Sequence, residues 1–263
     1  MRLATWNINS LRLRMPLLQR LVEEEAPDIV CLQETKVHDD LFPLDAVKAL
    51  GFEHVVFSGI KGYNGVAILS KLPLTNAGGH QWVGRTDGRH VFATLPNGTE
   101  VHSLYIPAGG DEPDPLINEK FDHKLKFVTE LKDWFPANRD PSRPIVLVGD
   151  LNIAPYEADV WSHKQLLKIV SHTPVETEGL IAALDAFGWV DTIRNRIPEP
   201  EKVYTWWSYR GRDWRASDRG RRLDHIWATP SIASAIGSPK ILKDARDWPQ
   251  PSDHVPVLVT IDG

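Results

Sequence analysis

The chain has 263 residues, of which 42% are hydrophobic and 25% are charged, and its formal net charge is −5. This is the composition of a globular protein without biased tracts, and its acidic balance gives no direct sign of a nucleic-acid partner. The N-terminus lacks the apolar core of a signal peptide, and no apolar run approaches the roughly 18 residues of a membrane span. We therefore expect a soluble, cytoplasmic protein that does not bind membranes.

Apolar periodicity predicts many short strands and three helices. In chain order, we expect a strand at residues 2–7, a helix at 16–25, strands at 28–34, 55–58, 66–70, 91–95 and 100–106, a helix at 116–135, a strand at 144–149, a helix at 178–187, and strands at 204–209, 223–228, 241–245 and 255–261. Tyr63-Asn64-Gly65 and Pro96-Asn97-Gly98 lie between apolar runs and predict hairpin turns.

This mixture of hairpins and helices has no regular βαβ alternation, which argues against a TIM barrel or a Rossmann domain. It favours stacked, largely antiparallel sheets with helices outside, in one domain spanning residues 1–263. The sequence contains no Gly-rich phosphate loop, so nucleotide chemistry has no support. Its single cysteine, Cys31, lies in an apolar run and is interpreted as a small buried hydrophobe, consistent with a reducing compartment.

Five apolar strands carry acidic or amide side chains at their ends. These residues are Asn7, Glu34, Asp150 with Asn152, Asp224, and Asp253 with His254. A single carboxylate beside a core is usually a turn cap or a member of a structural ion pair, because burying it uncompensated is costly. Five such sites in one chain indicate that the strand ends converge, and that a divalent cation relieves the repulsion between their carboxylates.

The types of candidate ligand indicate which metal would bind. Carboxylate and amide oxygens are hard ligands that favour Mg²⁺ or Mn²⁺ over Zn²⁺, and the chain has one cysteine and no histidine pair at zinc spacing. Mg²⁺ typically takes one or two carboxylates together with a substrate phosphate. The remaining polar groups are then free to act as a base, an orienting group and an oxyanion stabiliser.

Seven motifs follow one another along the whole chain. They are Trp6-Asn7-Ile8-Asn9-Ser10-Leu11, Leu32-Gln33-Glu34-Thr35-Lys36, Tyr63-Asn64-Gly65-Val66-Ala67-Ile68, Tyr105-Ile106-Pro107, Gly149-Asp150-Leu151-Asn152-Ile153-Ala154-Pro155, Arg222-Leu223-Asp224-His225 and Ser252-Asp253-His254-Val255-Pro256. In this order they resemble the exonuclease III family of abasic-site endonucleases, within the endonuclease/exonuclease/phosphatase superfamily. Gln-Glu, Gly-Asp-x-Asn and Ser-Asp-His are shared with lipid and inositol phosphatases and with DNase I. Gln-Glu-Thr-Lys and Gly-Asp-Leu-Asn-Ile-Ala-Pro are closer to the DNA-repair branch.

The resemblance implies a DNase I-like α/β (α+β) fold, a four-layered α/β sandwich of two packed sheets flanked by helices, with the site at one rim. It implies Mg²⁺-dependent hydrolysis of phosphodiester bonds in duplex DNA for base excision repair. The implied activities are abasic-site endonuclease, 3′→5′ exodeoxyribonuclease and 3′-phosphatase or 3′-phosphodiesterase. The implied partner is double-stranded DNA with abasic sites or 3′ ends, bound by a nucleoid-associated monomer.

The resemblance also assigns roles to the polar residues. Glu34 would be the principal metal ligand, and the other candidate metal residues are Asn7, Asp150, Asn152, Asp253 and His254. Asp150 would activate or align the attacking water while hydrogen-bonded to Asn152. His254, oriented by Asp224, would stabilise the charge on the scissile phosphate, and Tyr105 would assist at the phosphate or the leaving group. Ser103 and Ala108 depart from the Asn and Gln that many relatives carry near that tyrosine, so contacts there are expected to differ.

The segment 206–222 is the predicted DNA-binding surface. It holds Arg210, Arg212, Arg215, Arg219, Arg221 and Arg222 against Asp213 and Asp218, a local balance of +4. Arginine forks suit phosphates, and planar rings suit an exposed base or a vacated base position. The predicted DNA contacts are Tyr63, Asn64, Trp206, Trp207, Arg210 and Trp214, with residues 157–172 as a further candidate segment. The resemblance places Trp206 at the pocket for a flipped abasic sugar, whose lack of stacking makes extrusion cheap.

Two other function classes stay open from the sequence. The first is a phosphatase of the same superfamily that acts on inositol or lipid phosphates, which the arginine- and tryptophan-rich segment argues against. The second is a non-enzymatic nucleic-acid-binding regulator. Such a regulator need not keep the catalytic set, whereas Glu34, Asp150, Asn152, Asp224 and His254 are all present here.

Overall fold

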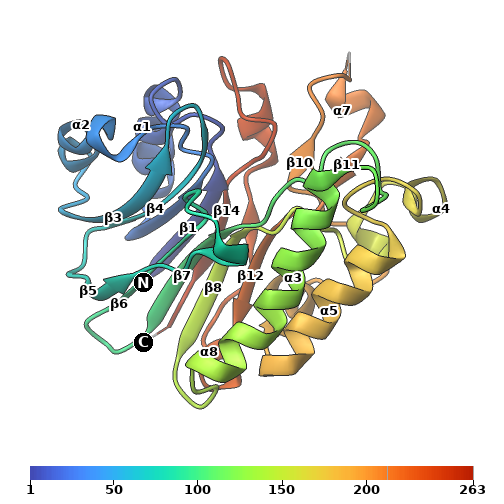
Figure 1. Cartoon of the computed structure of the whole chain (residues 1–263). Helices are drawn as coiled ribbons and strands as arrows, with labels where there is room; N and C mark the ends of the chain where they lie inside the picture. Colours follow the sequence, from blue (N-terminus) through green and yellow to red (C-terminus); the bar gives the residue numbers. More distant parts are fainter. Residues whose placement is uncertain (212, 263) are drawn as a thin grey trace.

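The computed structural model describes residues 1–211 and 213–262, in which two six-stranded sheets pack face to face (Figure 1). The strands are β1 (Arg2–Asn7), β2 (Ile29–Gln33), β3 (His54–Ile60), β4 (Tyr63–Ser70), β5 (Thr75–Gly78), β6 (His90–Thr94), β7 (Glu100–Tyr105), β8 (Ile145–Asp150), β9 (Val190–Asp191), β10 (Trp206–Trp207), β11 (Gly220–Arg221), β12 (Asp224–Ala228), β13 (Lys240–Ile241) and β14 (Val257–Thr260). The α-helices are α1 (Met15–Glu25), α2 (Leu44–Ala49), α3 (Glu119–Asn138), α4 (His163–Leu166), α5 (Pro174–Phe187), α6 (Thr192–Arg196), α7 (Trp214–Ser217) and α8 (Pro230–Ala233).

The first sheet has the order β13-β14-β1-β2-β4-β3, and the second has the order β5-β6-β7-β8-β12-β9. Two strand pairs are parallel, β1 with β2 and β7 with β8, and the other described pairs are antiparallel. Helices α1 and α3 supply the crossovers that parallel pairing requires. Each parallel pair therefore ends at the same edge of its sheet, and this edge carries the predicted site residues.

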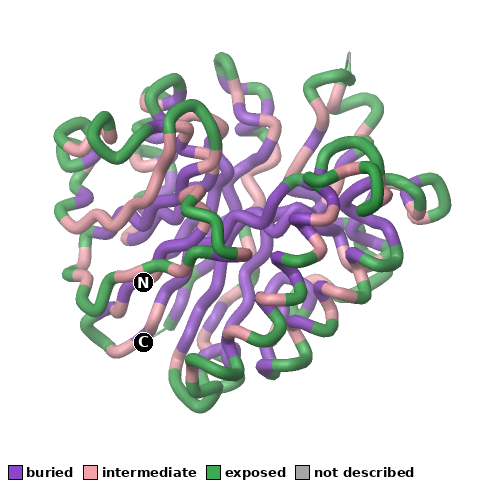
Figure 2. Tube along the Cα trace, viewed as in Figure 1, coloured by how far each residue is buried: buried purple, intermediate pink, exposed green. Residues whose placement is uncertain are grey.

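Buried residues run along the strands of both sheets (Figure 2), and alternation along these strands separates three of the four hydrophobic clusters of the described residues. The cluster between the sheets includes Cys31, Ile68, Val146, Val148 and Ile226. The cluster under α1 includes Leu18, Leu21, Val30, Leu32 and Trp6. The cluster under α3 and α5 includes Phe127, Leu131, Leu180, Leu147 and Trp227. The predicted four-layered sandwich is confirmed, and every described helix is too short or too polar to cross a membrane.

Several local predictions were wrong. The first hairpin turns at Lys61 and Gly62, because Ile60 pairs with Tyr63, and residues 63–65 instead lie in β4. The strand predicted at 241–245 ends at Ile241 and continues as a 3-10 helix, Lys243–Asp247. The strand predicted at 204–209 is reduced to β10, which pairs only with the short β11. Strand β5 was not predicted, because residues 75–78 lack an alternating apolar pattern.

Candidate active site

The predicted catalytic residues lie at or next to strand ends, at one edge of the two sheets. Asp150 is the last residue of β8, and it is in register with Tyr105 on one side and Asp224 on the other. On the facing sheet, Asn7 is the last residue of β1 and is in register with Gln33, which Glu34 follows. Pairing within each sheet therefore aligns these side chains, and packing of the two sheets brings the two groups together.

Asp150 is the centre of the arrangement and is fully buried. Its Oδ2 accepts hydrogen bonds from the Nδ2 groups of Asn7 at 2.8 Å and Asn152 at 3.1 Å. Its Oδ1 accepts the backbone N–H of Asn152 at 2.9 Å. Burial raises the pKa of this carboxyl above its ordinary value, while the neighbouring His254 charge and the Asn7 hydrogen bond act in the opposite direction. The raised pKa suits Asp150 to accept a proton.

His254 is held between two buried carboxylates. Its Nδ1 donates to Asp224 Oδ2 at 2.8 Å, and its Nε2 lies 3.6 Å from Asp150 Oδ2. Burial alone would lower the pKa of His254, but Asp224 and Asp150 outweigh burial and raise the pKa well above its ordinary value. The two carboxylates therefore favour the cationic form of the imidazole, and the contact with Asp224 fixes the orientation of its ring.

Glu34 is the most exposed of the acids at the centre, with 19% of its side chain accessible. Its Oε1 accepts from Asn7 Nδ2 at 2.9 Å and from the Tyr105 hydroxyl at 2.8 Å, and its Oε2 lies 2.9 Å from Lys36 Nζ. Burial acts to raise the pKa of Glu34, but Lys36 and these hydrogen bonds lower it below its ordinary value. Burial, together with the charges of Glu34 and Asp150, raises the pKa of Tyr105, which is therefore a neutral hydroxyl donor.

Asp253 is connected to this centre through a chain of polar contacts. Its Oδ1 accepts from Asn9 Nδ2 at 3.1 Å, and its Oδ2 accepts from Trp206 Nε1 at 2.9 Å. Asn9 Oδ1 in turn accepts from Lys36 Nζ at 2.6 Å. Asn9 and Lys36 were not assigned a role from the sequence, although both lie inside the recognised motifs. Their contacts link the Glu34 side of the site to the tryptophan on the DNA-binding segment.

The donor set fits a hard divalent cation. The Asn7 side-chain amide donates to both the Glu34 carboxylate, at 2.9 Å, and the Asp150 carboxylate, at 2.8 Å, so these two carboxylates flank the same amide group. Asp150, Asp224 and His254 also offer possible ligand atoms within 4.8 Å of one another. A protonated imidazole has no lone pair to give, however, and Asp224 is engaged by it. The pairing of Glu34 with Asp150 therefore suits Mg²⁺ or Mn²⁺ better than the group containing His254.

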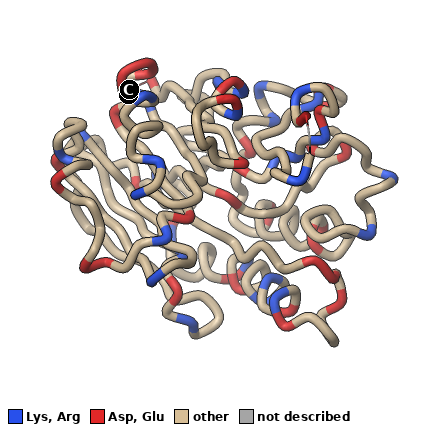
Figure 3. The backbone as a smooth tube through the Cα atoms, turned by 90° about the horizontal axis from the view of Figure 1, so that it is seen from above, with Lys and Arg blue, Asp and Glu red and all other residues tan. Residues whose placement is uncertain are grey.

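The predicted DNA-binding segment divides into surface and buried residues. Trp206 is half-buried with the Arg221 guanidinium 5.2 Å above its ring, and Arg210 is exposed. Trp207 is buried with its Nε1 donating to Asp218, so its predicted contact with DNA does not fit its position. Trp214 is half-buried and donates to Asp247. Seen from above, basic and acidic residues are intermixed on this side of the molecule (Figure 3).

The arginines of this segment differ in burial and in their ion pairs. Arg222 is fully buried between Asp159 and Asp191, so its inclusion in the contact surface was wrong. Arg215 is exposed but paired with Asp244 and Asp247. Arg219 is exposed and stacks on Trp161. Arg212 lies outside the described residues. The positive balance that the sequence indicated is therefore reduced by internal pairing.

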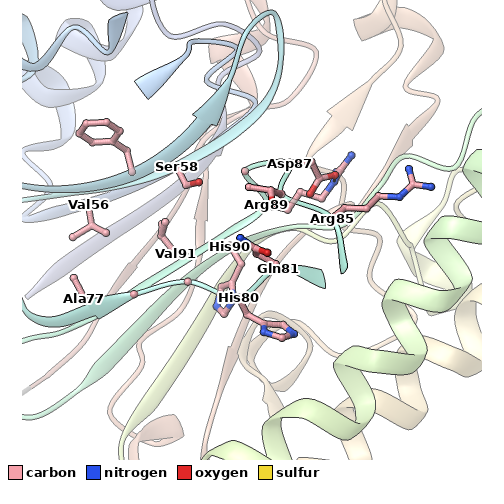
Figure 4. A pocket seen from close by; sticks show the side chains of 15 residues that line it. Val56, Ser58, Ala77, His80, Gln81, Arg85, Asp87, Arg89, His90 and Val91 are labelled. Atoms are coloured by element: carbon pink, nitrogen blue, oxygen red, sulfur yellow. The ribbon is translucent and has the colours of Figure 1, made fainter. Parts of the chain in front are cut away.

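Tyr63 and Asn64, the other predicted contacts, flank the site on the facing sheet. Tyr63 is 72% exposed, whereas the Asn64 side chain donates to the backbone carbonyl of Asp87 and accepts from the Arg89 guanidinium. Arg89 also lies 4.9 Å from the Tyr105 ring, a support that the sequence did not indicate. A cavity of about 340 Å³ adjoins this arginine between the edges of the two sheets (Figure 4). Among the described residues that line it, none belongs to the predicted site.

Replacing Trp206 with alanine should impair cleavage at an abasic site more than removal of a 3′-phosphate. The half-buried ring donates a hydrogen bond to Asp253 at the site, and a flipped sugar needs a pocket wall that an end phosphate does not. Trp206→Phe keeps the ring and removes the hydrogen bond, so it should retain abasic cleavage better than Trp206→Ala. Single-turnover rates on the two substrates measure this difference, and equal losses would remove the proposed pocket role.

His225 gives the fold a defined acid sensitivity. Its Nε2 donates to Ile153 O at 2.8 Å, and its Nδ1 accepts from Arg222 at 3.1 Å. Burial, followed by the charge of Arg222, lowers the pKa of His225 to about 4. Below pH 6.5 His225 binds a proton in the unfolded chain but stays neutral in the folded chain. The free energy of unfolding therefore falls as the pH drops from 6.5 towards 4. The resulting loss of unfolding free energy is roughly 3 kcal/mol. Urea unfolding at pH 7 and 4.5 should show a smaller decrease for His225→Gln than for the wild type.

Comparisons with known proteins agree with this geometry. The sequence model of the Endonuclease/Exonuclease/phosphatase family matches residues 4–254. The chain is 31% identical to an exodeoxyribonuclease III of Haemophilus influenzae, covering 98% of both chains. An AP endonuclease from Archaeoglobus fulgidus shares 32% identity over 100% of both chains, with a TM-score of 0.93. The 3′-phosphatase NExo from Neisseria, solved with a product DNA hairpin, shares 33% identity over 100% of both chains, with a TM-score of 0.91. The chain therefore belongs to the Endonuclease/Exonuclease/phosphatase family, and its resemblance to exonuclease III enzymes is confirmed.

Proposed function

We propose that this chain is a metal-dependent DNA-repair nuclease that hydrolyses phosphodiester bonds in duplex DNA at abasic sites and at 3′ ends. The observation that carries the proposal is that Glu34, Asp150 and the His254–Asp224 pair meet in one network of polar contacts. The relatives whose names record exodeoxyribonuclease, AP endonuclease and 3′-phosphatase activities support the same chemistry and substrate. We further propose that residues 1–263 act as one domain, as a monomer, in the cytoplasm at the nucleoid.

In the proposed reaction, water attacks the scissile phosphorus in line with the leaving oxygen. Asp150 accepts or aligns the proton of that water, because both its oxygens are fixed by Asn152 and Asn7. The His254 cation neutralises charge on the non-bridging oxygens, and Asp224 keeps its ring oriented. The neutral Tyr105 hydroxyl donates to Glu34 and is available to the leaving group.

We assign the metal to Glu34 and Asp150, with Asn7 and Asp253 near them. A bound Mg²⁺ or Mn²⁺ would supply Lewis-acid stabilisation of the phosphoryl oxygens. Lys36 keeps Glu34 ionised, and Asn7 holds the Glu34 and Asp150 carboxylates at a fixed separation. These contacts preorganise the site, so little reorganisation is needed when substrate binds.

The proposal is tested with three duplexes and one preparation of the protein. One duplex contains a single tetrahydrofuran abasic analogue, one ends in a 3′-phosphate, and one has an undamaged 3′ end. Each is incubated with Mg²⁺ and, separately, with EDTA. Scission at the abasic site only with metal is the expected result, and the relative rates rank the three activities. Phosphate release from an inositol phosphate without scission of DNA, or DNA binding without turnover, would overturn the proposal.

A further inference from the structure

A fully buried lysine lies against the loop that follows β8. Lys124 belongs to α3, and its Nζ contacts three acceptors from three separate segments. These are Asn152 O at 2.8 Å, Ala108 O at 3.2 Å and Glu176 Oε1 at 2.5 Å. An ammonium group has three N–H donors, so every donor has a partner. Lys124 therefore cross-links the loops that follow β7 and β8, the two strands that end at Tyr105 and Asp150.

Glu176 gives this lysine a fixed counter-charge. It is also fully buried, and it sits in the first turn of α5, where it forms a capping box with Thr173. Its carboxylate accepts the backbone N–H groups of Ser171 and Thr173 as well as the Thr173 hydroxyl. Because these partners are backbone or capping groups, the carboxylate cannot move without unwinding the start of α5. The pair is anchored on the two helices that cover the second sheet.

Asn152 shows why such an anchor is needed. Its backbone has a φ of +52°, a left-handed conformation that costs a non-glycine residue free energy and persists only when its surroundings fix it. In this conformation its backbone N–H and its side-chain amide both reach the carboxylate of Asp150. Its carbonyl points the other way and is the group that Lys124 binds. Releasing the carbonyl would release the constraint on both contacts to Asp150.

We propose that Lys124 and Glu176 are a positioning pair, which fixes the backbone at Asn152 and Ala108 and so aims Asp150 and Asn152 at the scissile phosphate. Neither side chain touches the substrate. The Lys124 stem also packs against Gly109, where an added Cβ would lie 2.9 Å from Lys124 Cδ, so the site admits no wider side chain. The expected effect on kcat rests on the proposed nuclease activity, whereas the expected loss of backbone order at Asn152 and Ala108 rests on geometry alone.

The test uses the double variant Lys124→Met/Glu176→Gln. The single Lys124→Met variant leaves a buried carboxylate without its cation and is expected to lose much of its stability. In the double variant, methionine fills the volume of the lysine stem, and the single carbonyl oxygen of glutamine can still accept the hydrogen bonds that Glu176 Oε2 accepts from Ser171 and Thr173. The matched control is Lys126→Met, which removes an exposed lysine of the same helix from its pair with Asp122.

We expect kcat of the folded double variant to fall by about 10- to 100-fold, with KM for the abasic duplex within about twofold of wild type. Lys126→Met should leave both unchanged. Amide hydrogen exchange of residues 105–110 and 150–154 should accelerate in the double variant only. A kcat that falls only in proportion to the folded fraction, or unchanged exchange in both segments, would overturn the pair's role. If the wild type itself fails to cleave DNA, the proposed function fails, and the exchange measurement alone decides the positioning role.

Discussion

Replacing Asp150 with asparagine should lower the rate of abasic-site cleavage by roughly 10²- to 10⁴-fold, the contribution typical of a positioned general base. The carboxylate is fully buried and both of its oxygens accept hydrogen bonds, so asparagine keeps the size of the side chain but removes the charge and turns one acceptor oxygen into an amide NH2 that faces N–H donors of Asn7 or Asn152. DNA affinity should change little, because the Asp150 side chain is fully buried in the protein without DNA.

The rate is measured under single-turnover conditions with Mg²⁺, and affinity is measured by fluorescence anisotropy with EDTA. Asp140→Asn is the matched control, since Asp140 is an exposed acid that precedes the opposite end of the same strand. The control should cleave like wild type. An Asp150→Asn protein that retains wild-type turnover would show that another group activates the water.

Replacing Asp159 with asparagine should destabilise the fold by about 3–5 kcal/mol, the range for breaking a buried ion pair. Asp159 is fully buried and accepts from the guanidinium groups of Arg194 and Arg222. Burial acts against the carboxylate, but the charges of these two arginines keep the pKa of Asp159 below its ordinary value. Removing its charge leaves both arginines buried with less compensation, although Arg222 keeps its contact with Asp191.

Urea unfolding at neutral pH measures this change. Asp122→Asn is the control, because it breaks an exposed pair with Lys126 on the surface of α3 and should cost less than about 1 kcal/mol. The effect extends to the active site, since Arg222 lies two residues before Asp224 in the chain. If the Asp159 variant loses less stability than the surface control, the network does not support the fold as described.

The sequence predicted the site better than it predicted the loops around it. Asn7, Glu34, Asp150 and Asp224 were identified because each interrupts a strongly apolar strand end, a pattern that depends on local sequence alone. The four layers were implied by the resemblance to the exonuclease III family, and in the structure the residues of β2 and β8 face two clusters in turn. Register then fixed the contacts, since Tyr105, Asp150 and Asp224 are direct neighbours across the sheet.

The burial of charged residues could not be predicted in the same way. Arginine and lysine are usually surface residues, and only tertiary packing places Arg222 beside Asp159 and Lys124 beside Glu176. Trp207 lies next to Trp206 in sequence, yet neighbouring residues of a strand point to opposite faces, so one is buried while the other stays half-exposed. The misplaced hairpin turn has a local cause, because Asn64 adopts a left-handed conformation within β4 without forming the turn.

The central claim is that residues from distant parts of the chain hold one divalent ion against a DNA phosphate. Equilibrium binding of Mn²⁺, followed by the EPR signal of the free ion, tests it on an abasic duplex with an uncleavable linkage. We predict saturable binding that the duplex strengthens and that Glu34→Gln weakens by at least about tenfold. Binding that is indifferent both to the duplex and to the loss of the Glu34 carboxylate would contradict the account.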